Sequence, residues 1–144
     1  MFIESFSMLI TLAKERGYSN ENIELIKRAY DIASVYSINR FRYRIKTRPF
    51  INHLISVCSI LIYSNLNIET VVAGLLHSVK NDMPKIYNLN NTVGEIVDKY
   101  FDPTTGAKEQ KQIENTNNID WAVIAIQLAN TTDMIMAGEY KSPE

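Results

Sequence analysis

The chain has few of the residues that mark disulfide-rich, membrane-spanning or secreted proteins. Its 144 residues include one cysteine, Cys58, so no disulfide can form within the chain. The longest apolar stretch, residues 54–63, is much shorter than the roughly 20 residues that a membrane-spanning helix needs. The N-terminal residues lack the basic segment that begins a secretory leader. We therefore expect a cytoplasmic protein with no membrane partner.

The sequence also lacks a dominant charge and several common catalytic motifs. Its 15 Lys and Arg residues are matched by 16 Asp and Glu residues, which gives a net charge of −1. A chain so nearly neutral has no global electrostatic attraction for nucleic acid or an anionic membrane. It contains no glycine-rich phosphate loop, Cys-x-x-Cys pair or Gly-x-Ser-x-Gly elbow.

Helical periodicity, in contrast, is present along most of the chain. Hydrophobic residues make up 46% of the sequence, which is enough for the single core of one domain over residues 1–144. Apolar residues recur at helical spacing between capping residues, Gly and Pro. The predicted helices span about residues 2–16, 20–36, 49–63, 68–82, 92–100 and 119–136. We therefore predict an all-α bundle of about six helices.

The C-terminal third of the chain has two further features. Apolar periodicity is absent from residues 102–118, which predicts an exposed mobile loop. On the following helix, Trp121, Ile124, Ala125 and Leu128 form one apolar stripe, and Gly138 follows the helix end.

Two of the predicted helices carry polar side chains within apolar surroundings. On the helix over residues 68–82, His77 and Asn81 lie one turn apart, and so do Ser78 and Asp82. Pro84 ends this helix, so Asp82 lies near a C-terminus, where the helix dipole disfavours a carboxylate. The only other histidine lies on the preceding apolar helix. The pattern predicts a polar pocket inside the bundle.

The most basic segment runs from Arg40 to Arg48, where cations alternate with apolar side chains. The alternation alone is typical of a strand, but Pro49 and the flanking helices favour an ordered loop. One interpretation is a solvated linker whose aromatic residues pack inward. The other is an anion cradle at the mouth of the pocket, in which Arg44 and Arg48 hold a phosphate or carboxylate.

Three segments match, in order, the motifs of a known family. They are Arg48-Pro49-Phe50-Ile51-Asn52-His53, then Leu75-Leu76-His77-Ser78-Val79-Lys80-Asn81-Asp82, and finally Leu128-Ala129-Asn130. From about Ala29 to Met134 the chain resembles the HD-domain superfamily, and within it the hydrolase domain of the alarmone (guanosine polyphosphate) synthetase/hydrolases. The resemblance implies an HD-like helical bundle whose basic loop contacts a nucleotide.

The metal site of that family is only partly matched. In the family, two histidines and two aspartates hold a divalent cation, commonly manganese, which activates water against a phosphoester. The matching residues here are His53, His77, Ser78 and Asn130, so both carboxylates are replaced. The lost charge predicts poor binding of manganese or magnesium, whereas two imidazoles can still bind zinc weakly. Asp133, one turn beyond Asn130, is a nearby carboxylate that could replace a lost ligand.

These observations favour a degenerate HD-fold protein that has lost metal-dependent hydrolysis. It would bind a small polar, anionic or phosphorylated molecule, or perform metal-independent acid–base chemistry. The candidate catalytic residues are His53, His77 and Asp82, where Asn81 and Asp82 match the catalytic Glu-Asp pair of the family. The candidate ligand-binding residues are Arg44, Arg48, Ser78, Asn81 and Asn130. No tightly bound cofactor is expected, and manganese or zinc would have only His53 and His77 as weak ligands.

Two alternative functions stay open from the sequence. A divergent metal-dependent nucleotide phosphohydrolase would need a carboxylate oxygen from Asp82 or Asp133 at its metal. A protein-interaction module with a vestigial pocket would expose a large apolar patch, or form a stable homodimer through its first helix. Nothing in the sequence points to a nucleic-acid partner.

Overall fold

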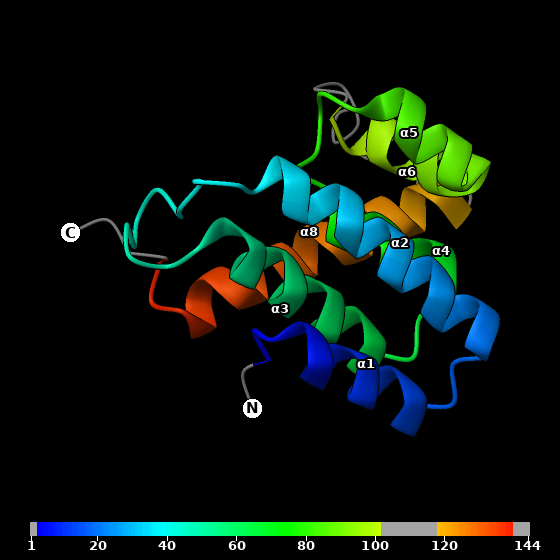
Figure 1. Cartoon of the computed structure of the whole chain (residues 1–144), viewed down its shortest axis with the longest axis horizontal. Coiled ribbons are helices and arrows are strands. Elements are labelled where there is room, and N and C mark those ends of the chain that lie inside the picture. Colours follow the sequence, from blue (N-terminus) through cyan, green and yellow to red (C-terminus); the bar gives the residue numbers. More distant parts are fainter. Residues whose placement is uncertain (1–2, 102–117, 140–144) are drawn as a thin grey trace.

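The computed structural model describes residues 3–101 and 118–139, which fold into a bundle of α-helices (Figure 1). The helices are α1 (Phe6–Glu15), α2 (Asn20–Tyr36), α3 (Phe50–Tyr63), α4 (Ile68–Leu76), α5 (Met83–Leu89), α6 (Asn91–Tyr100) and α8 (Asn118–Met136). The predicted all-α class is confirmed, although the described ranges contain seven helices and not six. None of these helices has both the length and the apolar character that crossing a membrane requires. The loop predicted at 102–118 lies outside the described residues, apart from its last residue.

Helices α3 and α4 form the centre of the bundle. Every α4 residue from Thr70 to Leu76 is buried, and α3 is buried continuously from His53 to Ser59. A helix that is apolar on all sides must be covered on all sides. The two helices accordingly contact each other, α2 and α8, while α1 covers α3 and α6 covers α4. Gly74 permits their close approach, since a Cβ atom there would collide with Leu61.

Short polar side chains begin the helices, largely as predicted. The side chain of Ser19 caps α2, and that of Asn67 caps α4 by accepting the N–H of Thr70 at 2.9 Å. Helix α6 is capped by Asn90 and begins at Asn91, one residue before the predicted start at residue 92. The starts of α2, α4 and α6 were therefore predicted to within one residue, because their caps are local signals.

The segment that follows α4 differs from the prediction. Helix α4 ends before His77, which is its C-cap residue, and residues 77–82 form turns and irregular backbone. The helical pairings predicted for His77 with Asn81 and for Ser78 with Asp82 are therefore wrong. Because the chain leaves the helix at His77, no shared helical turn aligns the members of these two pairs.

Asp82 lies at the start of a helix and not at the end of one. It is the N-cap residue of α5, and Pro84 lies in the first turn of that helix. Proline has no N–H to donate and suits a helix start, so Pro84 begins α5 instead of ending α4. The helix dipole therefore favours the Asp82 carboxylate, contrary to the prediction.

The apolar stripe predicted on α8 is not the stripe that this helix buries. The buried residues of α8 are Ala122, Val123, Ile126, Ala129 and Asp133. Trp121 and Leu128 of the predicted stripe instead lie exposed on the outside. Because apolar residues occur on all sides of α8, periodicity alone did not define the side that faces the core.

Residues 40–48 form an ordered loop between α2 and α3, as predicted. An isolated bridge pairs Phe41 with Pro49, and the N–H of Arg42 donates to the carbonyl of Arg48 at 2.9 Å. Phe41 and Tyr43 are exposed, so these aromatic side chains do not pack inward as the linker interpretation expected. Arg48 is instead the loop residue that is buried.

Candidate functional site

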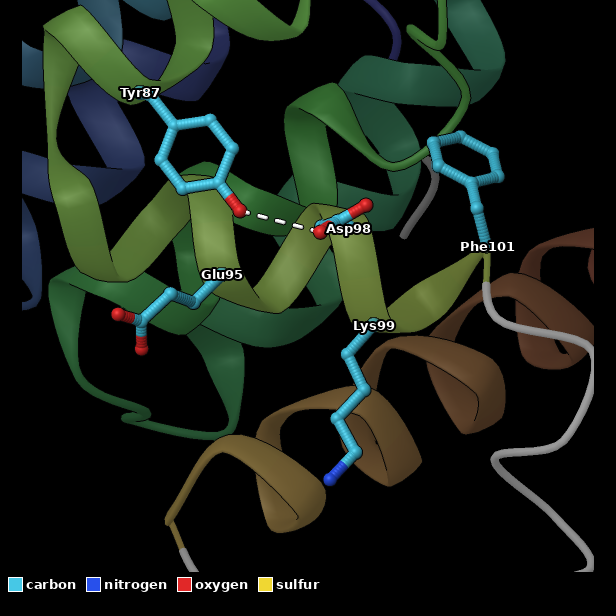
Figure 2. Close-up of a pocket in the computed structure, with 5 residues that line it drawn as sticks. All are labelled: Tyr87, Glu95, Asp98, Lys99 and Phe101. Atoms are coloured by element: carbon cyan, nitrogen blue, oxygen red, sulfur yellow. Dashed lines mark hydrogen bonds between the residues drawn. The ribbon is translucent and has the colours of Figure 1, made fainter.

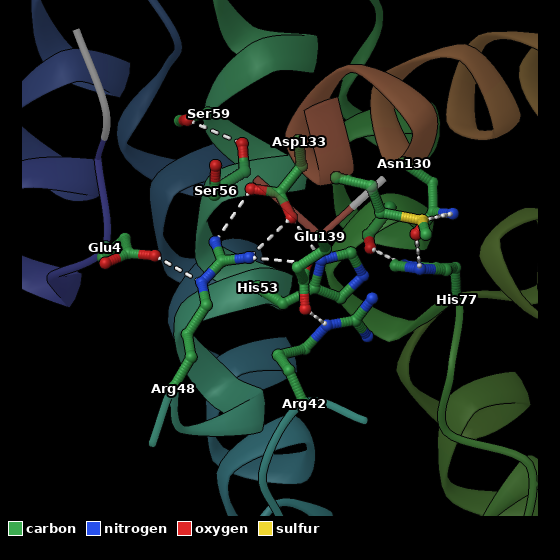
Figure 3. Close-up of polar contacts among 12 residues, drawn as sticks. Glu4, Arg42, Arg48, His53, Ser56, Ser59, His77, Asn130, Asp133 and Glu139 are labelled. Atoms are coloured by element: carbon green, nitrogen blue, oxygen red, sulfur yellow. Dashed lines mark hydrogen bonds and ion pairs between the residues drawn. The ribbon is translucent and has the colours of Figure 1, made fainter. Parts of the chain in front are cut away.

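Three helices bring both histidines and Asn130 together in the interior (Figure 3). His53 projects from α3, His77 from the end of α4 and Asn130 from α8. The two imidazole rings lie edge to face with centroids 5.5 Å apart. Oδ1 of Asn130 lies 3.2 Å from Nε2 of His77. The imidazoles are only 1% and 2% exposed and Asn130 is half-buried, so three predicted site residues form one cluster.

Aromatic rings extend this cluster on both sides. Phe50 packs edge to face on His53 with centroids 5.9 Å apart, and Tyr100 packs on His77 at 5.2 Å. Phe101 packs in turn on Tyr100 at 5.8 Å. Surroundings of this kind exclude water and disfavour the charged form of an imidazole.

A backbone partner sets the proton position on His77. Nδ1 lies 2.6 Å from the carbonyl oxygen of Gly74, which can only accept, so Nδ1 carries the hydrogen. Burial, with a smaller effect of the nearby His53, lowers the pKa of His77 to about 4. The ring is therefore neutral at pH 7, and its Nε2 atom is an acceptor.

Asn130 suits this neutral imidazole in one orientation of its amide. With Oδ1 toward Nε2 of His77, two acceptors face each other at 3.2 Å. Half a turn of the amide brings the donor Nδ2 to the same place, and that atom otherwise has only the weak acceptor Sδ of Met134 at 3.6 Å. An aspartate at this position, as the family has, could not donate to Nε2 when ionised. The amide at position 130 can therefore satisfy the acceptor of a metal-free His77.

A buried carboxylate holds the second histidine. Nδ1 of His53 lies 2.5 Å from Oδ2 of Asp133, which is fully buried on α8. Burial alone would raise the pKa of Asp133, but hydrogen bonds from His53, Arg48 and Ser56 outweigh it and hold that pKa well below its usual range. The ionised carboxylate accepts from Nδ1, which fixes the orientation of the ring.

Arg48 is the central cation of the site. Nη1 and Nη2 lie 3.0 and 2.8 Å from the two carboxylate oxygens of Asp133. Nη1 also lies 3.0 Å from Oε2 of Glu139, and Nε lies 2.6 Å from Oε1 of Glu4. Burial alone would lower the pKa of Arg48, but its hydrogen bonds to Asp133 and Glu4 raise it. One charged guanidinium therefore joins Glu4, near the start of the described chain, to Asp133 and Glu139 near its end.

Glu139 reaches this cation through the turn that follows α8. Gly138 adopts a φ of 74°, and the N–H of Glu139 donates to the carbonyl of Met134 at 2.8 Å. This turn reverses the chain and buries Glu139 fully. The carboxylate of Glu139 also accepts a hydrogen bond from Nε of Arg42 at 2.7 Å. Arg42 and Arg48 of the basic loop, of which Arg48 belongs to the predicted anion cradle, thus bind carboxylates of the protein itself.

The residues present do not fit the divalent cation that the resemblance implies. Within the described residues, the donor atoms of His53, Asp133 and Glu139 lie within 4.8 Å of one another and could hold a metal. Both carboxylates of that group already bind the guanidinium of Arg48. The four positions that match the family offer two imidazoles, a hydroxyl and an amide, a set without the oxygen charge that manganese prefers. A metal here would have to displace a buried arginine.

The other predicted site residues lie apart from the cluster. Ser78 is half-buried beyond His77, while Asn81 and Arg44 are exposed. The carboxylate of Asp82 lies 3.3 Å from Nζ of Lys85 on its own helix. Within the described part of the chain, no hydrogen bond or ion pair joins these four predicted residues to either histidine. Asp82 is therefore not placed as a third catalytic group.

A cavity of about 420 Å³ opens on the surface of α5 and α6 (Figure 2). It is lined by Tyr87, Glu95, Asp98, Lys99 and Phe101. Tyr87 donates a hydrogen bond to Asp98 at 3.3 Å, and Lys99 forms an ion pair with Asp120 of α8. The cavity contains no predicted site residue, and its charged side chains serve the packing of these helices. We assign it no function.

A search against models of known protein families finds none that matches this chain. The resemblance to the HD superfamily rests on the three sequence motifs and stays a prediction. The structure adds the relative positions of the motif residues, with His53 and His77 in contact and Asn130 beside His77.

Sequence reasoning missed Glu4 and Glu139 and the internal role of Arg48. Their bonds join residues that are 44 and 91 positions apart, and no local pattern marks such pairs. Gly138 signalled a turn after the last helix but not where the turn leads. Asp133 was considered only as a metal ligand, because a buried ion pair cannot be distinguished from an exposed one in the sequence.

The buried, neutral His77 predicts that the protein loses stability in acid. Its pKa is about 4 in the folded state, compared with the ordinary histidine value of 6.5 that we take for the unfolded state. Between these values the unfolded state binds more protons, so the free energy of unfolding decreases as the pH falls from about 6.5 to about 4. The full shift corresponds to roughly 3 kcal/mol. Urea denaturation at a series of pH values measures this decrease.

The matched variant is His77→Asn, which keeps a donor toward Gly74 but does not titrate. We expect it to lose most of the pH dependence in that window. The lowered pKa of Asp133 affects stability in a more acidic range. The stabilisation that it provides is complete above the ordinary pKa of 3.8 and is lost only as the pH falls below that value. If the free energy of unfolding of His77→Asn decreases with pH as steeply as that of the natural protein, other groups cause the pH dependence.

Removal of Arg48 is predicted to destabilise the fold strongly. Arg48→Met would leave Asp133 and Glu139 as buried carboxylates without this cation, at a cost of roughly 3–5 kcal/mol in the free energy of unfolding. Arg44→Met is the matched control, the same change at an exposed position of the same loop, with an expected effect within about 0.5 kcal/mol. Chemical denaturation of both variants compares them. Equal effects would contradict the central role of Arg48.

Proposed function

We propose that this chain is a degenerate HD-type domain that binds a small polar or phosphorylated molecule without metal-dependent hydrolysis. The observation that carries the proposal is the cluster of His53, His77 and Asn130. Both histidines that match metal ligands of the family are present, and their rings contact each other. The third position carries an amide that can donate to His77, and an amide supports a metal-free imidazole better than a metal.

The cluster is chemically suited to a ligand that donates hydrogen bonds. Both histidines use Nδ1 inside the protein, His53 toward Asp133 and His77 toward Gly74. In a neutral ring the Nε2 atom is an acceptor. Asn130 already donates to that of His77, so Nε2 of His53 is the acceptor that matches a hydroxyl or N–H group of a sugar or a base. Because both rings are buried, a ligand would reach them only after the surrounding side chains shift.

The anionic part of such a ligand would bind at the outer side of the basic loop. Arg42 and Arg48 bind Glu139 and Asp133, so they do not serve an external phosphate in this conformation. Arg44 and Lys46 of the same loop are exposed. The proposed anion site therefore consists of these two cations.

Binding is better supported than acid–base catalysis. With a pKa of about 4, His77 can accept a proton at pH 7 but cannot donate one. Asp82 pairs with Lys85 and not with either histidine. Metal-independent chemistry would then rest on His53 and Asp133 alone. The divergent phosphohydrolase would need Asp133 released from Arg48, and no observation favours that release.

Restoring the family's two aspartates tests the arrangement. We predict that Ser78→Asp combined with Asn130→Asp binds one equivalent of manganese, whereas the natural sequence binds none tightly. Calorimetric titration of tag-free protein measures the difference. Ser78→Asn combined with Asn130→Asp is the control, because it adds similar bulk but one carboxylate fewer. No gain in affinity would contradict the HD arrangement, and hydrolysis of nucleotides by the natural protein with manganese would contradict the loss of catalysis.

The anion site is tested with nucleoside polyphosphates, guanosine polyphosphates included, in the presence of EDTA. We predict that Arg44→Ala weakens binding about tenfold, the loss expected for one charge-assisted contact, and leaves the melting temperature unchanged. Arg28→Ala, an exposed arginine of α2, is the matched control and should bind normally. Thermal shift and titration calorimetry measure both. If no phosphorylated molecule binds the natural protein, the ligand proposed here is wrong.

A further inference from the structure

The outer face of α8 carries four large apolar side chains and no charge. Its exposed residues are Asn118, Trp121, Gln127, Leu128, Thr131, Thr132, Ile135 and Met136. Trp121, Leu128 and Ile135 are 58%, 64% and 60% exposed. Charged residues make up 22% of the whole chain, yet none is among these eight. A solvent-facing helix side normally carries charge, whereas depletion of charge with enrichment of Trp and Met is typical of an interface core.

Hollows lie at both ends of this face. Near the start of α8, Trp121 borders a cavity of about 140 Å³ together with Leu66 and Thr70. Near its end, Met136 borders a cavity of about 380 Å³ with Ile60 and other residues of α3. The face is therefore bordered at each end by a hollow that α8 shares with neighbouring segments.

We propose that this face is a homodimer interface in which α8 of a second copy packs antiparallel on α8. Trp121, Leu128 and Ile135 follow one another at intervals of seven residues, close to two helical turns, so they lie along one line. Leu128 is midway between the other two. A two-fold axis at Leu128 pairs Trp121 of each copy with Ile135 of the other, as an isologous interface requires.

A second copy is the occupant that the chemistry favours. An uncharged stripe is complementary to itself, because no like charges meet across the axis. The antiparallel arrangement also brings the indole of Trp121 near the larger hollow beside Met136 of the second copy.

No other segment of this sequence is a comparable occupant. The residues outside the described ranges include only four large hydrophobic side chains, Met1, Phe2, Ile113 and Tyr140. The first helix, which the sequence suggested as the dimer helix, buries Leu9, Ile10, Leu12 and Ala13 within the bundle.

The size of the face predicts a weak dimer. Its eight exposed residues and the rims of two hollows fall below the roughly 20–30 residues per side of a standard interface. Association should therefore depend on protein concentration. It should also be insensitive to salt, because no ion pair contributes.

The experiment is sedimentation velocity on the full chain over about 1 μM to 500 μM, where an interface of this size would assemble. We expect a monomer–dimer equilibrium that is unchanged in about 0.5 M NaCl, an ionic strength that screens surface charges. Leu128→Glu, which places like charges on the axis, should give monomer alone with unchanged helicity by circular dichroism. Val35→Glu is the matched control, since Val35 is 65% exposed on α2, and it should still dimerise. A monomer at every concentration, or a dimer that survives Leu128→Glu, would overturn the proposal.

Cysteine cross-linking tests the orientation of the two helices. The native Cys58 is buried, so mild oxidation reports on introduced thiols. Leu128→Cys lies on the proposed axis and should form an intermolecular disulfide, whereas Trp121→Cys should not. Cross-linking of Trp121→Cys, with or without cross-linking of Leu128→Cys, would overturn the antiparallel arrangement.

Discussion

The arrangement of this protein depends on the buried ion pair between Arg48 and Asp133. Arg48 ends the basic loop just before α3, Asp133 lies on α8, and the same guanidinium holds Glu4 and Glu139 near the two ends of the described chain. Separating these charges in surroundings of low dielectric would cost much free energy. The pair therefore fixes the basic loop, α3 and α8 relative to one another. His53 depends on the same carboxylate. Through Asp133, this internal cation therefore helps to orient the ring of His53.

Local signals predicted much of the fold. Helix α3 begins one residue after the predicted start at 49, because Pro49 and a nearly continuous apolar run define it. The prediction failed between α4 and α5, where the apolar approach to His77 suggested that the helix continues. Proline can end one helix or begin the next, and only packing decides between the two. At α8 the apolar residues were identified, but not the side that faces the core.

The candidate site was predictable only in part. The order of the motifs brought His53, His77 and Asn130 into one hypothesis, and these residues lie together. Arg44 and Arg48 were expected to act alike, because the sequence gives both the same chemistry four residues apart. One is exposed and the other is buried against carboxylates far away in the chain. Such long-range pairing follows from the packing of whole helices and leaves no mark on neighbouring residues.

The position of Trp121 has a practical consequence. It is the only tryptophan of the chain, and it lies on the outer face of α8 and not in the core. An indole that already meets water in the folded state changes its surroundings little when the chain unfolds. Tryptophan emission is therefore a poor reporter of the core and a sensitive reporter of whatever covers α8, so folding of this protein is better followed by its helical circular dichroism.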